Sequence, residues 1–555
     1  MAATGATIAG PRPPACSDRD ARVIIIGCGL AGLNCAKHLL ERGLRPHQIV
    51  MLEASHRIGG RIKTDNGFIE GLSLDLGAEL IHGDQTSLYR LAKDKGWQME
   101  ELISLAQGDG GPLPADSNDG FGLFYLGGEK RMLAMDSKVC ILFDRVDCVI
   151  KLRRPAPRPD ARQKKKKKKT QPQQPPPKPP DPTPHPPRPD PAPPADLWPA
   201  MKLNGASTRL SESSPPMPQS LHDGLKAAGV KESMMGVAIA GYANTVGAAL
   251  EDTSLSGTCF LEHEWDRDGD RTFVLKGSLG LVVDELSAGL ENRIQTDWPA
   301  VKVDYPTGGP VVVTCKDGRK EEGTHVVSTL PLSILLDGDV EFLPPLPKTK
   351  LKAFGRMDMC HVVKVILRFD GPVLPPLLHG CICSESFIPE FWFRHLPNLP
   401  EGGYTCLAIG FAAGPPADAV SALKPEEALK KALHQLDTMF AGRQWLKGGG
   451  CNGKGDWENH APEDPSREPG TGSDGTIGGG AVGLPPSASY VGGLVHDWAD
   501  EPFVRGGYCY PRLGFDENTH AEAAAAVGDT LFFAGEHTNT PTGMTAHAAM
   551  DSGER

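Results

Sequence analysis

Three glycines and a glutamate near the N-terminus have the spacing of a site that binds a dinucleotide. Gly27, Gly29 and Gly32 follow a short apolar run and open a predicted helix, and Glu53 ends the next apolar run. The glycines would let the backbone approach a pyrophosphate, the helix N-terminus would offer amide donors, and Glu53 could accept hydrogen bonds from ribose hydroxyls. This context favours a dinucleotide-binding βαβ unit over a glycine-rich turn in an ordinary α/β domain.

A lysine interrupts a strongly apolar stretch in the second half of the chain. Residues 360–369 have the pattern of a buried strand apart from Lys364. Burying an unpaired ammonium group is costly. Lys364 therefore either faces solvent from an edge strand or has a function.

The elements that would position these groups alternate between strand and helix. Apolar runs predict strands at 23–26, 49–52, 301–315, 325–329, 360–369, 491–510 (with a turn at 506–507) and 530–535. Helical periodicity predicts helices at 30–42, 86–102, 425–440 and 546–555. The expected fold class is α/β, with a Rossmann-like domain assembled from both ends and a middle piece of the chain and an inserted α+β substrate domain.

The same pattern predicts where the domains begin and end. A tail at 1–20 precedes the Rossmann-like domain at 21–85, 266–335 and 496–555, and the substrate domain takes up 86–265 and 336–495. Two segments depart from a globular composition: a Pro/Lys-rich insert at 153–200, expected to be disordered, and a Gly-rich loop at 447–486. Neither segment is expected to carry chemistry.

The net charge of −11 conceals an asymmetry along the chain. Residues 151–200 hold thirteen Lys/Arg against four Asp, a balance of +9, so the remainder carries −20. An acidic body would attract cationic substrates and repel nucleic acid, although ordinary solubility explains the same charge. The lysine run 164–169 could be a nuclear localisation signal, a polyanion-binding patch or a solvated linker.

Cysteine usage and hydropathy give the expected compartment. The thirteen cysteines include no C-x-x-C pair and no metal-type Cys/His spacing, so they are expected to be reduced and no metal is predicted. There is no apolar run long enough to span a membrane, and the first twenty residues lack the pattern of a secretory signal. An intracellular location, cytoplasmic or peroxisomal, is expected, with a nuclear one open because of the lysine run.

Further motifs lie at both ends of the chain. They are the acidic and Gly-Gly-Arg block 53–61, the block 75–83, the block 498–510, and the pair 533–538 and 543–548. Together with the glycine-rich turn and Lys364 they resemble the flavin-dependent amine oxidase family, in particular its polyamine oxidase-like branch. The family also includes monoamine oxidases and lysine-specific histone demethylases.

The resemblance implies FAD as the cofactor. Arg61 would place its guanidinium on the FAD phosphates, Glu536 would hold the ribityl or phosphate region, and Glu79 and Leu80 would approach the flavin through their backbones. A helix N-terminus at 544–546 would stabilise the anionic reduced flavin. The implied FAD-binding residues are Gly27, Gly29, Leu30, Ala31, Gly32, Glu53, Ser55, Gly60, Arg61, Gly77, Ala78, Glu79, Leu80, Val301, Trp498, Gly535, Glu536, Met544, Thr545 and Ala546.

Three residues are implied on the catalytic side. Lys364 matches the family lysine that contacts the flavin N5 through a water and assists reoxidation by dioxygen. His82 would lie beside the flavin, with a substrate role and a structural role both open. Tyr508 would form one wall of an aromatic cage, whereas Thr545 replaces the second tyrosine of monoamine oxidases. Gly507 replaces their flavin-linked cysteine, so the FAD is expected to be non-covalent.

The implied reaction is oxidation of an amine C–N bond by hydride transfer to the flavin. The substrate would be a polyamine such as spermine, spermidine or an N1-acetyl form, and the products an aldehyde, a shorter amine and hydrogen peroxide. The expected partners are this small amine and dioxygen, without nucleic acid or a membrane span. Two alternatives stay open: a histone demethylase-like or other amine oxidase, and an inactive flavin-fold binding protein or truncated product.

Overall fold

The structure, a computed structural model, describes residues 21–102, 121–134, 219–371, 373–374, 378–397, 404–441, 484–539 and 543–555, apart from positions 129, 228, 233, 234 and 270. The insert predicted at 153–200 lies outside these residues, as does the predicted loop up to position 483. Among the described helices, none has both the length and the apolar character needed to cross a membrane.

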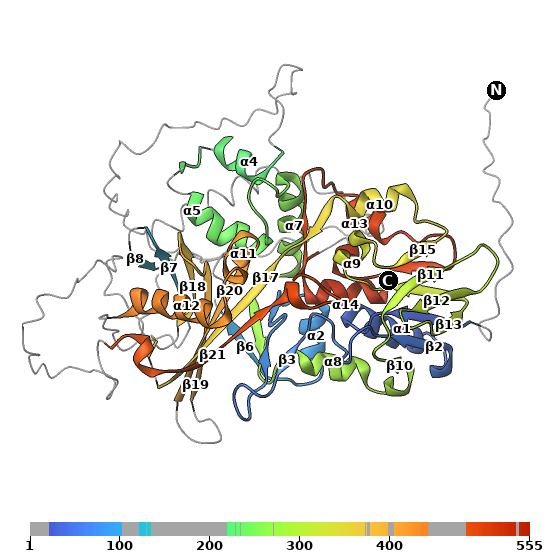
Figure 1. The fold of residues 1–555 in the computed structure, drawn as a ribbon, viewed down its shortest axis with the longest axis horizontal. Helices are drawn as coiled ribbons and strands as arrows, with labels where there is room; N and C mark the ends of the chain where they lie inside the picture. The colour runs from blue at the N-terminus through green and yellow to red at the C-terminus, as the bar shows by residue number, and fades with distance from the viewer. Residues whose placement is uncertain are drawn as a thin grey trace, which may run out of the picture. The chain divides into compact units, whose positions relative to one another are not determined.

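A five-stranded parallel sheet carries the glycine-rich turn (Figure 1). Its order is β10-β2-β1-β14-β23, and every neighbouring pair is parallel. The strands are β1 (Val23–Ile26), β2 (Ile49–Leu52), β10 (Ile294–Gln295), β14 (His325–Ser328) and β23 (Leu531–Phe533). All residues of β1 and β2 are buried, as parallel strands covered on both faces require. The sheet unites three segments that are far apart in the sequence.

Helices from the two ends of the described chain lie against each other beside this sheet. They are α1 (Leu30–Glu41) and α14 (Ala546–Glu554), which confirm the helices predicted there. A Cβ atom on Gly553 would lie 2.2 Å from the backbone oxygen of Ala31, so the close approach of the helices depends on this glycine. The side chain of Asn34 donates to the Met550 carbonyl at 2.7 Å and fixes the pairing.

A second, four-stranded sheet lies next in the middle of the chain, with the order β13-β12-β11-β15. The strands are β11 (Ala300–Asp304), β12 (Val311–Cys315), β13 (Lys320–Gly323) and β15 (Glu341–Leu343). The single strand predicted at 301–315 is therefore wrong, because β11 and β12 form an antiparallel hairpin. Gly308, with a φ of 75°, supplies the turn between them.

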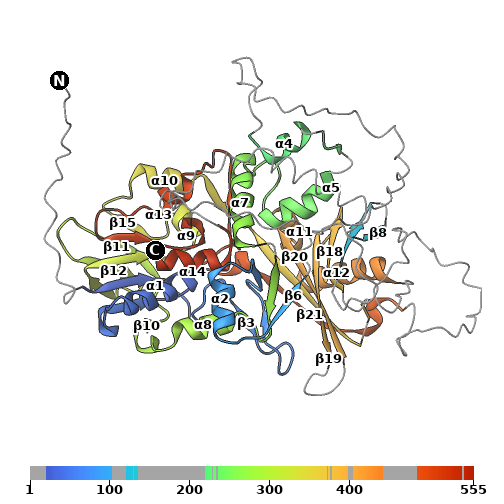
Figure 2. The same ribbon diagram turned by 180° about the vertical axis from the view of Figure 1, so that it is seen from behind.

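A seven-stranded sheet forms the second large layer (Figure 1, and from behind in Figure 2). Its order is β21-β17-β20-β19-β18-β7-β8. The strands are β7 (Phe121–Leu126), β8 (Arg131–Ala134), β17 (Val362–Asp370), β18 (Leu378–Ser384), β19 (Glu390–Pro397), β20 (Tyr404–Ala413) and β21 (Tyr490–Asp497). One face packs against α12 (Pro425–Phe440), which confirms the helix predicted at 425–440. The other face packs against Ile69, Leu74 and Leu76 from the N-terminal segment.

The helix predicted at 86–102 is only half correct. Helix α2 (Ser87–Asp94) ends before Gly96, whose φ of 66° stops it, and the chain continues as β6 (Met99–Leu102). Strand β6 pairs with β9 (Thr272–Leu275), which also pairs with β5 (Leu80–His82). The partner strand lies far along the chain, and the local pattern gave no sign of it.

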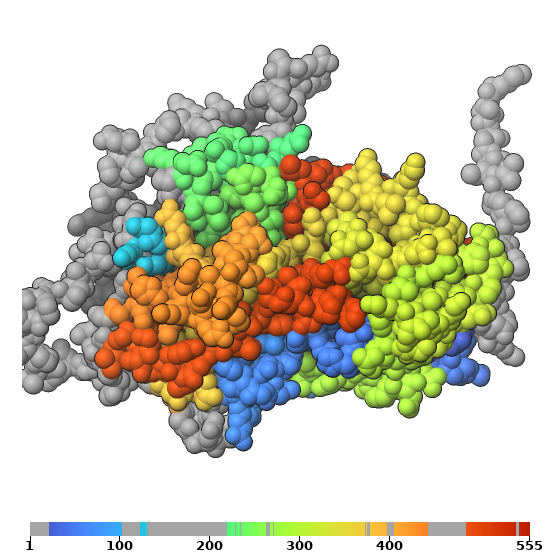
Figure 3. Space-filling model, in the orientation of Figure 1, coloured from blue at the N-terminus to red at the C-terminus, as the bar shows by residue number. Residues whose placement is uncertain are grey.

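The strand predicted at 491–510 is interrupted in the structure. Strand β21 ends at Asp497, a short 3₁₀ turn at Trp498–Asp500 follows, and β22 (Cys509–Pro511) pairs with β16 (Met357–Met359). In the space-filling view, the chain after residue 484, in orange-red, lies between the blue N-terminal segment and the yellow middle of the chain (Figure 3). This segment therefore links the two large sheets.

The remaining described elements are a two-stranded ribbon and further helices, of which α7 has 14 residues. Two strands, β3 (Thr64–Asp65) and β4 (Leu74–Asp75), form a ribbon. The other helices are α4 (Leu221–Ala227), α5 (Met235–Ala238), α6 (Asn244–Val246), α7 (Leu255–Asp268), α8 (Gly280–Ser287), α9 (Leu332–Asp337), α10 (Lys348–Phe354), α11 (Pro415–Ser421) and α13 (Thr519–Ala524), with a π-helical turn at Ile239–Ala243.

Candidate active site

A cavity of about 1150 Å³ is lined by residues of both large sheets and of the segments between them. This volume exceeds the roughly 300–1000 Å³ of ordinary small-molecule pockets. The predicted site residues that line it are Gly27, Gly29, Leu30, Ala31, Glu53, Ser55, Gly60, Arg61, Gly77, Ala78, Val301, Lys364, Trp498, Tyr508, Gly535, Glu536, Met544, Thr545 and Ala546. Gly32, Glu79, Leu80 and His82 were predicted too but are not among the lining residues.

The glycines of the first turn are needed for two different reasons. A Cβ atom on Gly32 would lie 2.0 Å from the backbone oxygen of Gly27, so the packing of α1 on β1 excludes any side chain there. A Cβ atom on Gly29 would come no closer than 4.0 Å to protein atoms, and Gly29 lines the cavity. Protein packing therefore does not require a glycine at position 29, whereas close approach of a ligand to the backbone does.

Glu53 is buried at the end of β2, where the dinucleotide pattern places its acidic residue. One carboxylate oxygen accepts a hydrogen bond from the Cys28 amide at 2.9 Å. The other accepts from the amide and the hydroxyl of Ser55, both at 3.0 Å. These neutral donors hold the carboxylate at the cavity wall without a cation that would compete with ribose hydroxyls.

Arg61 and Glu536 form a buried ion pair that joins the N-terminal and C-terminal segments. Arg61 Nη1 lies 2.7 Å from Glu536 Oε1 and 3.1 Å from the Gly507 carbonyl oxygen. Desolvation by itself would raise the pKa of Glu536, but the charge of Arg61 and a hydrogen bond from Cys509 lower it to about 2. The carboxylate is thus charged at physiological pH, and both side chains line the cavity.

The N-terminus of α14 lies at the cavity wall. Thr545 is the N-cap, and its hydroxyl accepts from the Ala548 amide at 3.1 Å. Met544, before it, has a φ of 70°, a strained value for a residue with a side chain. Met544, Thr545 and Ala546 all line the cavity, so the positive end of the helix dipole is available to an anionic group there.

Lys364 lies on β17, the second strand of the seven-stranded sheet, with only 6% of its surface exposed. Its strand, β17, has β20 on one side and β21 on the other, so the edge-strand interpretation is wrong. The ammonium donates to the Asp75 carbonyl at 3.0 Å and pairs with Glu79 Oε2 at 2.9 Å. Lys364 and Trp498 line the same cavity. The cost of burying the ammonium is thus offset by Glu79 and by a backbone acceptor.

Glu79 has a side-chain contact that the motif did not predict. Its two carboxylate oxygens pair with Lys364 and, at 3.5 Å, with Arg394 of β19. The sequence-based expectation concerned only its backbone. Asp75 lies close by, and its pKa is raised to about 7 by desolvation and by the charge of Glu79. The lysine thus belongs to a buried cluster of two cations and two carboxyl groups.

Tyr508 and Phe411 are two of the aromatic residues that line the cavity. The Tyr508 hydroxyl donates to the Thr245 carbonyl of α6 at 2.7 Å, and burial raises the pKa of the phenol well above its usual value. Phe411 was not predicted, although it is the direct partner of Lys364 on β20. Only the strand register, which the sequence does not reveal, could have identified it.

His82 lies on β5 opposite Thr272, and it is exposed. It is not among the residues that line the cavity. A direct role of His82 with the substrate stays a prediction.

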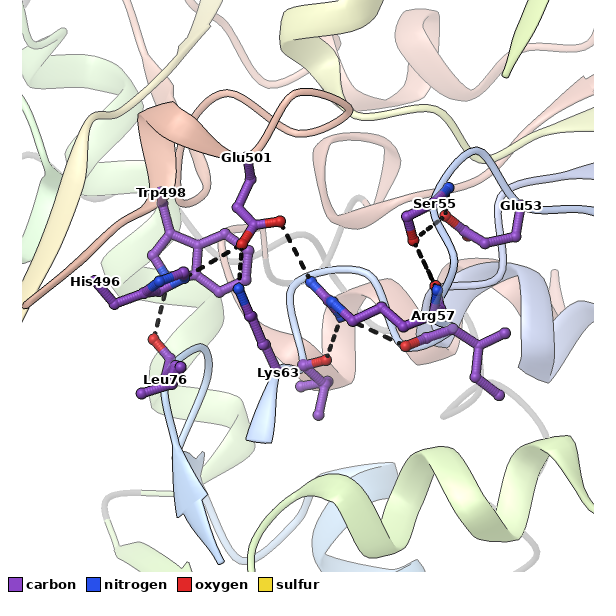
Figure 4. A network of polar contacts seen from close by, with 10 residues as sticks. Glu53, Ser55, Arg57, Lys63, Leu76, His496, Trp498 and Glu501 are labelled. Atoms are coloured by element: carbon purple, nitrogen blue, oxygen red, sulfur yellow. Dashed lines mark hydrogen bonds and ion pairs between the residues drawn. The ribbon is translucent and has the colours of Figure 1, made fainter. Parts of the chain in front are cut away.

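A polar network next to Trp498 was also missed by the sequence analysis (Figure 4). Glu501 pairs with Lys63 and lies 3.7 Å from both Arg57 and His496, while the Trp498 indole donates to the Leu76 carbonyl at 3.0 Å. Lys63, Arg57 and Glu501 line the cavity. Their only sequence signal is the pair of basic residues that flank the Gly-Gly-Arg motif.

The sequence matches one protein-family model over most of its length. Residues 30–555 match the family described as "Flavin containing amine oxidoreductase". The chain belongs to this family. The match confirms the resemblance to flavin-dependent amine oxidases and the expected fold class.

Known relatives of this flavin-containing amine oxidoreductase include two classes. Probable polyamine oxidase 4 from Arabidopsis thaliana is 23% identical over 96% of this chain and 85% of its own length. Lysine-specific histone demethylase 2 from Homo sapiens is 22% identical over 96% of this chain and 52% of its own length. Both classes had been expected from the motifs.

Solved structures share the fold. A putrescine oxidase triple mutant has a TM-score of 0.64 at 16% identity, covering 97% of each chain. Cyclohexylamine oxidase from Brevibacterium oxydans IH-35A has a TM-score of 0.63 at 17% identity, covering 96% of this chain and 97% of its own.

FAD is the cofactor of this oxidoreductase, as expected, and non-covalent binding is typical of the family. Three features of the structure fit FAD. The backbone at Gly29 is open for a pyrophosphate, Glu53 is placed to accept from a ribose, and the N-terminus of α14 suits an anionic group. A Cβ atom on Gly507 would lie 2.3 Å from Val362 Cγ2, so a flavin-linked cysteine would not fit there without a shift. Cys509 is buried beside Glu536, and burial raises the pKa of its thiol.

Proposed function

We propose that this amine oxidase cleaves a C–N bond of a polyamine such as spermine, spermidine or an N1-acetyl form, giving an aldehyde, a shorter amine and hydrogen peroxide. The observation that carries the proposal is the place of Lys364. It is buried on a strand that has a neighbour on each side, and it lines the same cavity as the glycine-rich turn. The polyamine oxidases among its relatives support the substrate class.

The cofactor supplies the redox chemistry. When bound, FAD accepts a hydride from the amine and passes the electrons on to dioxygen. The residues that would hold it are the lining set named above, with Glu53 at the ribose and the α14 N-terminus at an anionic group.

The protein's own side chains orient the amine and keep the site charged. Tyr508 and Phe411 form apolar walls against which a neutral amine can lie. Lys364, fixed by Glu79 and the Asp75 carbonyl, holds a positive charge and a proton donor at the cavity wall. The resemblance assigns to this lysine the water-mediated contact that assists the reaction with dioxygen.

A peroxide-coupled screen of the purified holoenzyme tests the proposal. The substrates are spermine, spermidine, their N1-acetyl forms, monoamines, L-amino acids and methylated histone-tail peptides. We expect peroxide from at least one polyamine. Peroxide from methylated peptides alone would replace the proposal with the demethylase alternative, and flavin-loaded protein that oxidises no amine would refute it.

Lys364→Met sharpens the test. Removing a preorganised charge from a reacting site typically costs about 10²-fold in rate. We expect a loss of about this size in the reaction of the reduced enzyme with dioxygen, and a much smaller change in anaerobic flavin reduction by the amine. Lys424→Met, at an exposed position before α12, is the matched control and should change neither rate.

A further inference from the structure

The N-cap of α14 makes two hydrogen-bonding contacts through one hydroxyl group. Thr545 Oγ1 accepts from the Ala548 amide at 3.1 Å and lies 3.1 Å from His547 Nε2. A hydroxyl group has two acceptor sites and one proton to donate. What Thr545 offers to the cavity therefore depends on whether its contact with His547 uses an acceptor site or the proton.

Asp268 decides which atom of this contact carries the proton. It ends α7, and its Oδ2 lies 3.0 Å from the same nitrogen, His547 Nε2. Because a carboxylate only accepts, Nε2 must carry a hydrogen, and this N–H is shared between Asp268 and Thr545. His547 is 2% exposed, so water does not replace either contact. The Thr545 oxygen thus accepts twice, from Ala548 and from His547.

The hydroxyl proton of Thr545 is left for the cavity. Among the described residues, Thr545 Oγ1 has no partner besides Ala548 and His547. Thr545 lines the cavity together with Met544 and Ala546, at the positive end of the α14 dipole. An acceptor atom bound at this end can therefore take the hydroxyl proton as well as the amide protons of the helix.

A second threonine N-cap uses its hydroxyl proton differently. Thr86 caps α2 and accepts from the Tyr89 amide at 3.3 Å, as Thr545 does in α14. The Thr86 hydroxyl, however, donates to the Gly83 carbonyl at 3.1 Å, and Thr86 is not among the residues that line the cavity. The proton of this cap is used within the protein. Capping by itself therefore does not require the arrangement found at Thr545.

We propose that Asp268 and His547 orient the Thr545 hydroxyl as a hydrogen-bond donor to the flavin at the N-terminus of α14. Flavin gains electron density when it is reduced, and a donor stabilises a charged acceptor more than a neutral one. The contact therefore favours the reduced cofactor. Asp268 and His547 are positioning residues, because they act through Thr545 and are not among the lining residues. The inference rests on FAD as the cofactor and not on the identity of the amine.

The midpoint potential of the flavin in the holoenzyme, measured without amine, tests this inference. Thr545→Val removes the donor, and we expect the reduced flavin to lose about tenfold in affinity relative to the oxidised flavin, a potential about 30 mV more negative. Thr545→Ser keeps the hydroxyl and should restore the potential. Asp268→Ala should lower it by a similar amount, because a neutral His547 can then present a lone pair at Nε2 and accept the hydroxyl proton itself.

Thr86→Val is the matched control, since it also removes an N-cap hydroxyl. Both valine variants should lower the free energy of unfolding of the apoprotein, but Thr86→Val should leave the potential unchanged. An unchanged potential in Thr545→Val would overturn the inference and leave Thr545 as an N-cap only. An unchanged potential with a raised KM for the amine would also overturn it, because the hydroxyl would then face the substrate. The potential is measured without amine, so failure of the proposed substrate class would leave this test intact.

Discussion

The two ends of the cavity are built around ion pairs that differ in how their charges are matched. At the dinucleotide end, Arg61 and Glu536 neutralise each other one to one. Around Lys364, Glu79 lies between two cations, Lys364 and Arg394, and of these three residues Lys364 lines the cavity. A one-to-one pair joins two segments of the chain, whereas a cluster with one more cation than it has paired carboxylates keeps a positive charge. The comparison therefore contrasts a structural ion pair with the charged cluster that we propose for the reaction.

The largest loss of stability is expected when the ion pair between Arg61 and Glu536 is broken. Arg61→Ala would leave Glu536 buried and charged, which typically costs about 4 kcal/mol. We expect a loss of this size in the free energy of unfolding, together with loss of FAD, measured by urea denaturation of the apoprotein and by flavin absorbance. Arg505→Ala, which removes an exposed pair with Asp337 and Asp339, should cost less than about 1 kcal/mol. Equal effects of the two variants would contradict the comparison.

Alanine substitutions at the two glycines of the first turn should distinguish an effect on packing from an effect on FAD binding. Gly32→Ala forces a Cβ atom against the Gly27 backbone and should destabilise the apoprotein by about 3 kcal/mol. Gly29→Ala should change its stability by less than about 0.5 kcal/mol but weaken FAD binding at least about tenfold. Unfolding of the apoprotein and FAD titration measure the two effects. A large loss of apoprotein stability in Gly29→Ala would show that packing governs both positions.

Removing the shared carboxylate tests the amine end. Glu79→Gln removes the carboxylate that pairs with both Lys364 and Arg394, and we expect the free energy of unfolding to fall by about 2 kcal/mol. Urea denaturation of the apoprotein measures this loss. Glu426→Gln, exposed on α12, is the control. An unchanged free energy of unfolding in Glu79→Gln would mean that Glu79 does not compensate the two buried cations.

The smallest effect concerns a surface cluster at the start of β17. His361 lies between Asp418 at 2.7 Å and Asp497 at 2.9 Å, and hydrogen bonds to both carboxylates raise its pKa from 6.5 to about 9. A raised pKa stabilises the fold fully below about pH 6.5, and the contribution is lost as pH rises through 9. Since Asp418 is largely exposed, we expect about 1–2 kcal/mol.

Unfolding at pH 6 and pH 9.5 measures this contribution. The His361→Gln variant should lose the part of the pH dependence that belongs to His361. A wild-type stability that does not fall over this interval would show that solvent screens the cluster completely.

Most of the dinucleotide-binding part of the cavity could be predicted from the sequence because its elements follow one another along the chain. The strand 23–26, the glycine-rich turn, α1 and the strand ending before Glu53 form one continuous stretch whose periodicities and glycines carry their own signals. The errors lay elsewhere. Residues 86–102 had to leave helical geometry to pair with β9, and 301–315 had to turn back as a hairpin. In both cases a distant or returning strand overrode local preference.

The amino-acid sequence by itself determined the dinucleotide motif and the family resemblance. It also identified Lys364 as a lysine whose burial would be costly unless its charge were compensated. Only the tertiary structure decided what surrounds that lysine: Glu79 from the N-terminal segment, Phe411 as its neighbour on β20, and Glu390 one strand further. Pairing between strands depends on register and on segments hundreds of residues apart. The local sequence pattern indicates which face of a strand is buried. Which residues lie beside a given side chain depends on how the strands pair when the sheets assemble.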